Sequence, residues 1–137
     1  MTGIVMCVAV LAASSAFGVL HRRRSGRVRV RVRDDGKRLG AAELGESLGE
    51  RATLVQFSSA FCAPCRATRR VLGEVAGLVP GVTHVEIDAE EHLDLVRKLD
   101  ILKTPTVLVL DADGRIVRRA TGQPRKEAVI AALGEAV

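Results

Sequence analysis

Two cysteines lie three positions apart, Cys62 and Cys65, with Ala63 and Pro64 between them and Phe61 before them. An apolar, β-rich run precedes the pair, and apolar residues at helical spacing follow it. At a helix start, the first thiol lies nearest the positive helix end, which favours its thiolate, and the second lies one turn inside. Proline in a first helical turn costs no hydrogen bond. Because thiol–disulfide exchange needs a reactive thiolate beside a second thiol, the pattern predicts a redox-active dithiol.

Metal binding is the alternative use of such a pair. Structural zinc sites need four ligands, but Cys7 falls in an apolar segment, and His21, His84 and His92 form no ligand-spaced pair. Copper(I) also suits soft thiolates, although Pro64 between the cysteines and the small number of methionines count against it. We therefore expect no metal and keep copper(I) handling as an alternative.

The chain after residue 33 alternates predicted strands and helices around this pair. Strands are predicted at 53–57, 82–87, 106–110 and 115–120, and helices at 41–48, 62–79, 90–99 and from Pro124 onward. Residues 111–114 predict a hairpin turn. The apolar helix residues expected to be buried are Val71, Leu72, Val75, Ala76, Val79, Leu93, Val96, Leu99, Val129 and Leu133. This order predicts an α/β fold, with a mixed sheet that has helices on both faces.

Length and composition limit the remaining classes of protein. A chain of 137 residues predicts one domain, and 47% apolar with 27% charged residues excludes wholesale disorder. Three cysteines are too few for a disulfide-stapled scaffold. The net charge of +5 comes from seven arginines within residues 1–33, which contain no acid; the rest has 14 basic and 16 acidic residues. We therefore expect no nucleic-acid partner.

The segment from Gly3 to Leu20 contains no charged side chain. As a helix it spans about 27 Å, close to the ~30 Å hydrocarbon core of a membrane. A cleaved signal peptide is the alternative, but the positive charges follow the apolar run, at 22–24, instead of preceding it. We expect an uncleaved single-pass anchor at 1–21, a basic juxtamembrane segment at 22–33 and a domain at 34–137. The positive-inside rule then places that domain in the cytoplasm, with the opposite orientation left open.

Residues 27–33 alternate Arg and Val with a strict period of two. This pattern predicts an edge strand with a charged face. The arginines also suit anionic lipid headgroups, at roughly 1 kcal/mol each near a membrane surface. Nucleic-acid binding is a third, disfavoured option, because no recognition motif accompanies the charge.

Taken together, these motifs resemble the thioredoxin superfamily over residues 34–137. The matching features are the strand 53–57, the motif at 61–65, Ile87-Asp88, Thr104-Pro105 before the strand at 106–110, and Gly122 before the last helix. The opening stretch, with Asp35-Gly36-Lys37 and then 39–54, resembles that of TlpA-like membrane-anchored thiol–disulfide reductases.

The resemblance implies roles for individual residues. Cys62 would attack a substrate disulfide and Cys65 would resolve the mixed disulfide. The Thr104-Pro105 peptide would be cis, and Thr104 would pair with the substrate backbone. The implied partners are protein disulfides and an upstream thiol or membrane electron donor, with no cofactor beyond the dithiol. A thioredoxin-fold adaptor, with its thiols incidental, is the alternative class, although an adaptor would not need this whole set.

Three positions depart from the family pattern. Phe61 replaces the usual Trp, Gln56 the buried acid, and His84 its Lys partner. Because Gln does not titrate, proton transfer to or from Cys65 would pass through water or His84; a merely space-filling His84 is the alternative. Without His between the cysteines, Ala63-Pro64 resembles the Gly-Pro of reducing thioredoxins, so we expect a reductase. Three arginines that follow the pair predict a solvated helix face: Arg66, Arg69 and Arg70.

Overall fold

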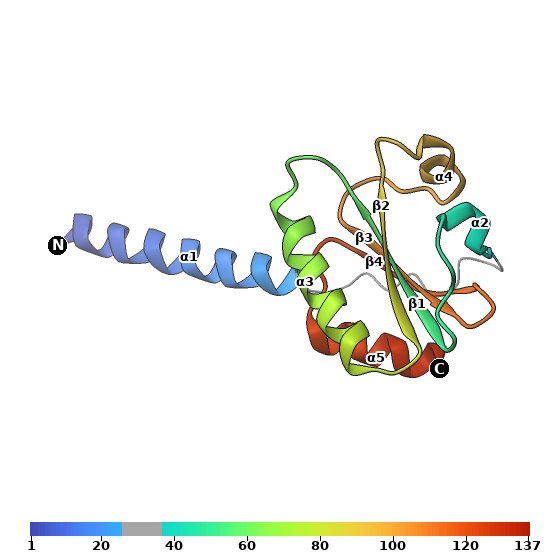
Figure 1. The fold of residues 1–137 in the computed structure, drawn as a ribbon. Coiled ribbons are helices and arrows are strands. Elements are labelled where there is room, and N and C mark those ends of the chain that lie inside the picture. Colours follow the sequence, from blue (N-terminus) through green and yellow to red (C-terminus); the bar gives the residue numbers. More distant parts are fainter. Residues whose placement is uncertain (26–36) are drawn as a thin grey trace.

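The computed structural model describes residues 1–25 and 37–137, with side chains for 1–21 and 37–137. Helix α1 (Thr2–Ser25) comes first, followed by an alternating α/β domain (Figure 1). Its elements are α2 (Ala41–Leu44), β1 (Ala52–Ser58), α3 (Ala63–Leu78), β2 (Val82–Asp88), α4 (Leu93–Lys98), β3 (Thr106–Asp111), β4 (Ile116–Thr121) and α5 (Lys126–Ala136). The predicted order of strands and helices is confirmed.

In the described residues the sheet has the strand order β2-β1-β3-β4. Strand β1 pairs in parallel with β2 and antiparallel with β3, and β3 pairs antiparallel with β4, so the predicted mixed sheet is confirmed. Phe57 of β1 lies opposite both Ile87 of β2 and Thr106 of β3. The ends of β1 and β2 therefore share one edge of the sheet with the beginning of β3.

Helices cover both faces of the sheet, as predicted. Helices α3 and α5 lie together on one face, and α2 and α4 lie on the other (Figure 1). All seven residues of β1 are buried, since the strand is central and covered on both sides. The α3/α5 face buries Leu54, Leu72, Val75, Val107, Val129 and Leu133, and the α2/α4 face buries Leu44, Phe57, Val85, Leu95, Leu99 and Leu108.

Two helices are shorter than their patterns predict. Helix α2 ends at Leu44 because Gly45 adopts a left-handed conformation, with φ of 72°. Helix α4 begins only at Leu93, after a turn in which the Asp88 carboxylate accepts the Glu90 N–H at 2.8 Å. The late start corrects the predicted stripe: Leu95 is buried, whereas Leu93 is 54% exposed.

Helix α1 is long and apolar enough over Thr2–His21 to cross a membrane, and none of that span is buried against the rest of the chain. The helix continues to Ser25, past the predicted end of the anchor at residue 21. The predicted strand at 27–33 and the opening stretch at 34–36 lie outside the described residues.

Candidate active site

The cysteine pair lies where β1 connects to α3, as the sequence predicts. Cys62 is the N-cap of α3, and its Sγ accepts the backbone N–H of Cys65 at 3.2 Å. Pro64 occupies the first turn, where its missing N–H costs nothing. Phe61 has a positive φ of 58° and a fully exposed ring. The connection thus presents an apolar ring to solvent directly before the first sulfur.

The two cysteines form a disulfide and differ in their exposure. Their sulfurs are bonded at 2.09 Å, with the Cα atoms 5.2 Å apart. Cys62 is half-buried, whereas Cys65 is 1% exposed. A disulfide on another protein can therefore approach Cys62 but not Cys65. This is the asymmetry that a two-step exchange requires.

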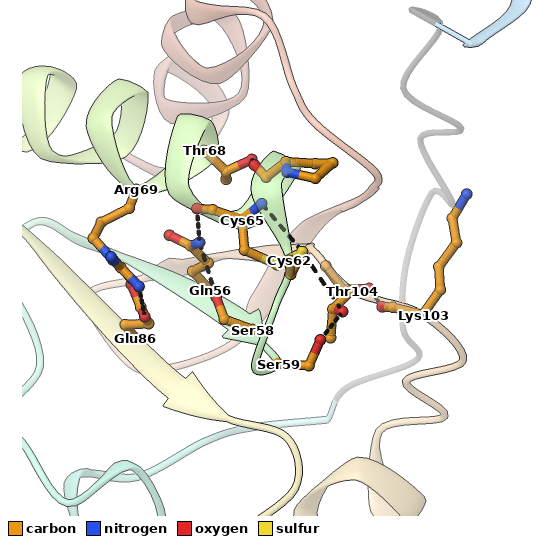
Figure 2. The surroundings of a disulfide bond; sticks show 12 residues. Gln56, Ser58, Ser59, Cys62, Cys65, Thr68, Arg69, Glu86, Lys103 and Thr104 are labelled. Atoms are coloured by element: carbon orange, nitrogen blue, oxygen red, sulfur yellow. Dashed lines mark hydrogen bonds and ion pairs between the residues drawn. A yellow bond between two sulfur atoms is a disulfide. The ribbon is translucent and has the colours of Figure 1, made fainter.

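Two hydroxyl groups, those of Ser59 and Thr104, form a hydrogen-bonded chain that ends at the Cys62 sulfur. The Thr104 hydroxyl donates to Cys62 Sγ at 3.9 Å, and the Oγ atoms of Ser59 and Thr104 are 2.7 Å apart (Figure 2). Because Thr104 has one hydroxyl proton, donating it to sulfur means that it accepts the proton of Ser59. The Thr104–Pro105 peptide is cis, as the resemblance implies. Sequence reasoning missed Ser59, since no motif marks a serine whose partner is 45 positions away.

Beneath the disulfide, Gln56 is fully buried and uses all its polar atoms. Its Nε2 donates to the Cys65 carbonyl at 2.8 Å and to Ser58 Oγ at 2.9 Å (Figure 2). Its Oε1 lies 3.1 Å from His84 Nε2. Since a carbonyl only accepts, the Cys65 contact fixes the amide orientation, and His84 Nε2 must carry a proton that it donates. The structure therefore brings His84 to Gln56 and not to a cysteine sulfur.

The surroundings of His84 disfavour its protonated form. Burial lowers the pKa of His84 below its usual value, and nearby Arg69 lowers it further, while Glu86 and Glu46 act in the opposite direction. Arg69 is ion-paired with Glu86, which ties α3 to β2 and raises the pKa of the Arg69 guanidinium. The predicted solvated face therefore holds for Arg66 and Arg70, which are exposed, but Arg69 has this partner.

A groove of about 730 Å³ begins beside the active-site connection. Pro64 and Val71 of α3 line one side, and Thr104-Pro105 and the start of α5 line the other. Within residues 1–21 and 37–137, no group of three or more His, Cys, Asp or Glu side chains is placed to hold a metal ion.

Comparisons with known proteins agree with this geometry. The thioredoxin family model matches residues 41–135. Thioredoxin H4-1 of Oryza sativa is 33% identical over 84 residues, which are 60% of this chain and 63% of that protein. The thioredoxin of Alicyclobacillus acidocaldarius is 33% identical over 64% of this chain and 83% of its own length.

A solved thioredoxin, NaTrxh from Nicotiana alata, shares the fold with a TM-score of 0.57 at 24% identity, over 64% of this chain and 74% of that one. The chain spans less than two thirds of the length of the plant and fungal relatives, 63% of the rice protein and 47% of two others. The matched domain contains the cysteine pair and the cis-proline loop. The chain belongs to the thioredoxin family.

Proposed function

We propose that this protein is a membrane-tethered thiol–disulfide oxidoreductase that reduces protein disulfides. The observation that carries the proposal is the unequal exposure of the two bonded sulfurs, with Cys62 reachable at the start of α3 and Cys65 buried behind it. Family membership supports the same class of chemistry.

In the reduced protein, the Cys62 thiolate attacks one sulfur of a substrate disulfide. A Cys62–substrate bond forms, the substrate bond breaks, and the first substrate thiolate leaves. Cys65 then loses its proton and attacks Cys62 Sγ, which releases the second substrate thiolate and closes the disulfide seen here. Two electrons pass to the substrate, and its two thiolates take up two protons.

One backbone amide and two side chains prepare the first step in this proposal. The Cys65 N–H and the Thr104 hydroxyl both donate to Cys62 Sγ, which favours a thiolate there. Ser59 is a positioning residue, because its own proton is what leaves the Thr104 proton free to point at sulfur. Thr104 and Pro105 also bound the groove, where the backbone of a substrate would lie.

Proton transfer at Cys65 is a separate matter, because this thiol is buried. Gln56 does not titrate, and it separates His84 from the cysteines. We propose that a proton leaves Cys65 by way of water, and that His84 acts by orienting Gln56 through Nε2. His84 Nδ1 remains the ring nitrogen that can exchange a proton with its surroundings.

The proposed direction is reduction. Ala63 and Pro64 separate the cysteines, and no histidine lies between them to stabilise the thiolate as strongly oxidising relatives do. After each turnover the disulfide needs two electrons from an upstream thiol or a membrane electron donor. Helix α1 is the proposed tether, and Arg22–Arg24 at its end favour a cytoplasmic domain.

The experiment that tests the function uses the full chain in non-ionic detergent with a disulfide-linked peptide as substrate. We expect the reduced chain to cleave the peptide with a stoichiometry of one disulfide per chain. Cys65→Ser should accumulate a mixed disulfide with the peptide, visible by mass spectrometry, whereas Cys62→Ser should form none. Stoichiometric copper(I) binding without any peptide cleavage would contradict the proposal and favour metal handling.

A further inference from the structure

The groove beside the disulfide has a basic rim. Its charged lining residues are Lys103, Arg125, Lys126 and Glu127, three cations against one carboxylate. Lys126 Nζ lies 3.3 Å from Glu74 Oε2, and this ion pair partly neutralises the charge of Lys126. Lys103 and Arg125 are exposed, and no carboxylate within 1–21 and 37–137 forms an ion pair with either.

The excess of bases over acids in the groove lining contrasts with the charge balance of the domain as a whole. The part of the chain from residue 34 onward has a small excess of acids, and acidic side chains gather at the β2–α4 turn, at Asp88, Glu90 and Glu91. Lys103 precedes Thr104 in the same loop, and Figure 2 shows its side chain extending away from Ser59. Lys103 and Arg125, which have no ion-pair partner among the residues that the structure describes, both line the groove, one on the cis-proline loop and one before α5.

We propose that this groove selects acidic segments that flank the disulfide cysteine of a protein substrate. The inference rests on the proposed function, because the groove begins at Pro64 and Thr104, beside the sulfur that a substrate disulfide must reach. A chain held there lies along the wall that Lys103 and Arg125 line. Unpaired cations attract carboxylates and raise association rates at low salt, and this effect is screened as ionic strength rises.

The test compares three disulfide-linked peptide dimers that differ only in two residues next to the cysteine, which are Glu, Gln or Lys. Reduction by the full chain in non-ionic detergent should be fastest for the Glu peptide and slowest for the Lys peptide at low salt. In Lys103→Gln/Arg125→Gln, the ratio of Glu-peptide to Lys-peptide rates should fall by roughly 2- to 10-fold, as expected for two exposed charge pairs. High salt should reduce the ratio in the parent chain.

The matched control is Arg51→Gln/Arg115→Gln, which removes the same net charge at the opposite end of the sheet, before β1 and before β4. This control should leave the ratio unchanged. An equal fall in both double variants would overturn the groove assignment in favour of overall charge. Equal rates for the three peptides would overturn the proposed selectivity while leaving the reductase function intact, whereas no reduction of any peptide would refute the function itself.

Discussion

The side-chain amide of Gln56 donates a hydrogen bond to the backbone carbonyl of Cys65 at 2.8 Å. This contact joins the central strand β1 to the first turn of α3, directly beneath the buried sulfur. Because the same amide nitrogen also reaches Ser58 and the amide oxygen meets His84, the position of Cys65 depends on a network that Gln56 completes.

Replacement of Gln56 by Leu removes these hydrogen bonds and leaves buried polar groups without partners. We expect the free energy of unfolding to fall by about 1–3 kcal/mol, measured by urea titration with circular dichroism on the oxidised full chain. Gln123→Leu, the same change at an exposed position, should stay within about 0.5 kcal/mol of the parent. Unchanged stability in the Gln56 variant would show that the network contributes nothing to the fold.

Ser59→Ala removes the proton that the Thr104 hydroxyl accepts. Thr104 is then free to turn away from Cys62, which weakens the stabilisation of the thiolate. In a Cys7→Ser background, the midpoint of the pH profile for iodoacetamide alkylation of Cys62 should move up by about 0.7 pH unit, which corresponds to one hydrogen bond of about 1 kcal/mol.

Ser59→Thr keeps a hydroxyl at this position and should restore the parent profile. Thr104→Val should move the midpoint at least as far as Ser59→Ala, since it removes the direct donor to sulfur. If Thr104→Val shifts the profile and Ser59→Ala does not, Ser59 has no positioning role.

Burial lowers the pKa of His84 below the usual value near 6.5. As the pH falls through 6.5, the unfolded chain therefore takes up a proton that the folded chain does not, and stability decreases until the lower folded pKa is reached. Above about pH 7.5 both forms are neutral and His84 makes no pH-dependent contribution. We expect the parent to lose more stability than His84→Gln between pH 7.5 and 5.5, by at most about 1.4 kcal/mol per pH unit.

The control for this prediction is His92→Gln, because His92 is exposed at the start of α4. The thermal midpoint of the His92→Gln variant, followed by circular dichroism, should change with pH in the same way as the midpoint of the parent chain. The same slope in the parent and in His84→Gln would contradict the assignment of this pH dependence to His84.

Tethering predicts where the chain is found in cells that express it. The full chain should stay with membranes after an alkaline wash, and deletion of residues 1–21 should release the domain. With the outside of the cell exposed to protease, the domain should remain intact. Cleavage of the domain at intact cells would reverse the proposed orientation, and loss of the full chain in the wash would exclude the anchor.

Much of the fold follows from local patterns. Strands β1 and β3 are mostly apolar because both of their faces are covered, and α3 follows from its apolar spacing and the proline in its first turn. The start of α4 does not follow, since the Asp88–Glu90 turn competes with the helix that the apolar pattern predicts. The same turn also determines which leucine of α4 is buried, because it leaves Leu93 exposed.

The active site also contains some features that the sequence predicts and others that only the fold determines. The cysteine pair and the cis-proline loop are evident from short motifs, whereas the Ser59–Thr104 contact joins positions 45 residues apart and depends on the register of β1 and β3. The resemblance singles out Gln56 and His84, but which nitrogen of His84 donates follows only from the orientation of the Gln56 amide.

The reduction potential of the Cys62–Cys65 pair decides whether the protein reduces disulfides or makes them. The full chain would be equilibrated with defined ratios of oxidised and reduced thiols, and the two states separated by the mass of a thiol label. We predict a value of about −270 mV, as for reducing thioredoxins. A value of about −120 mV, in the range of strong oxidants, would contradict the proposed reductase and indicate a protein that makes disulfides.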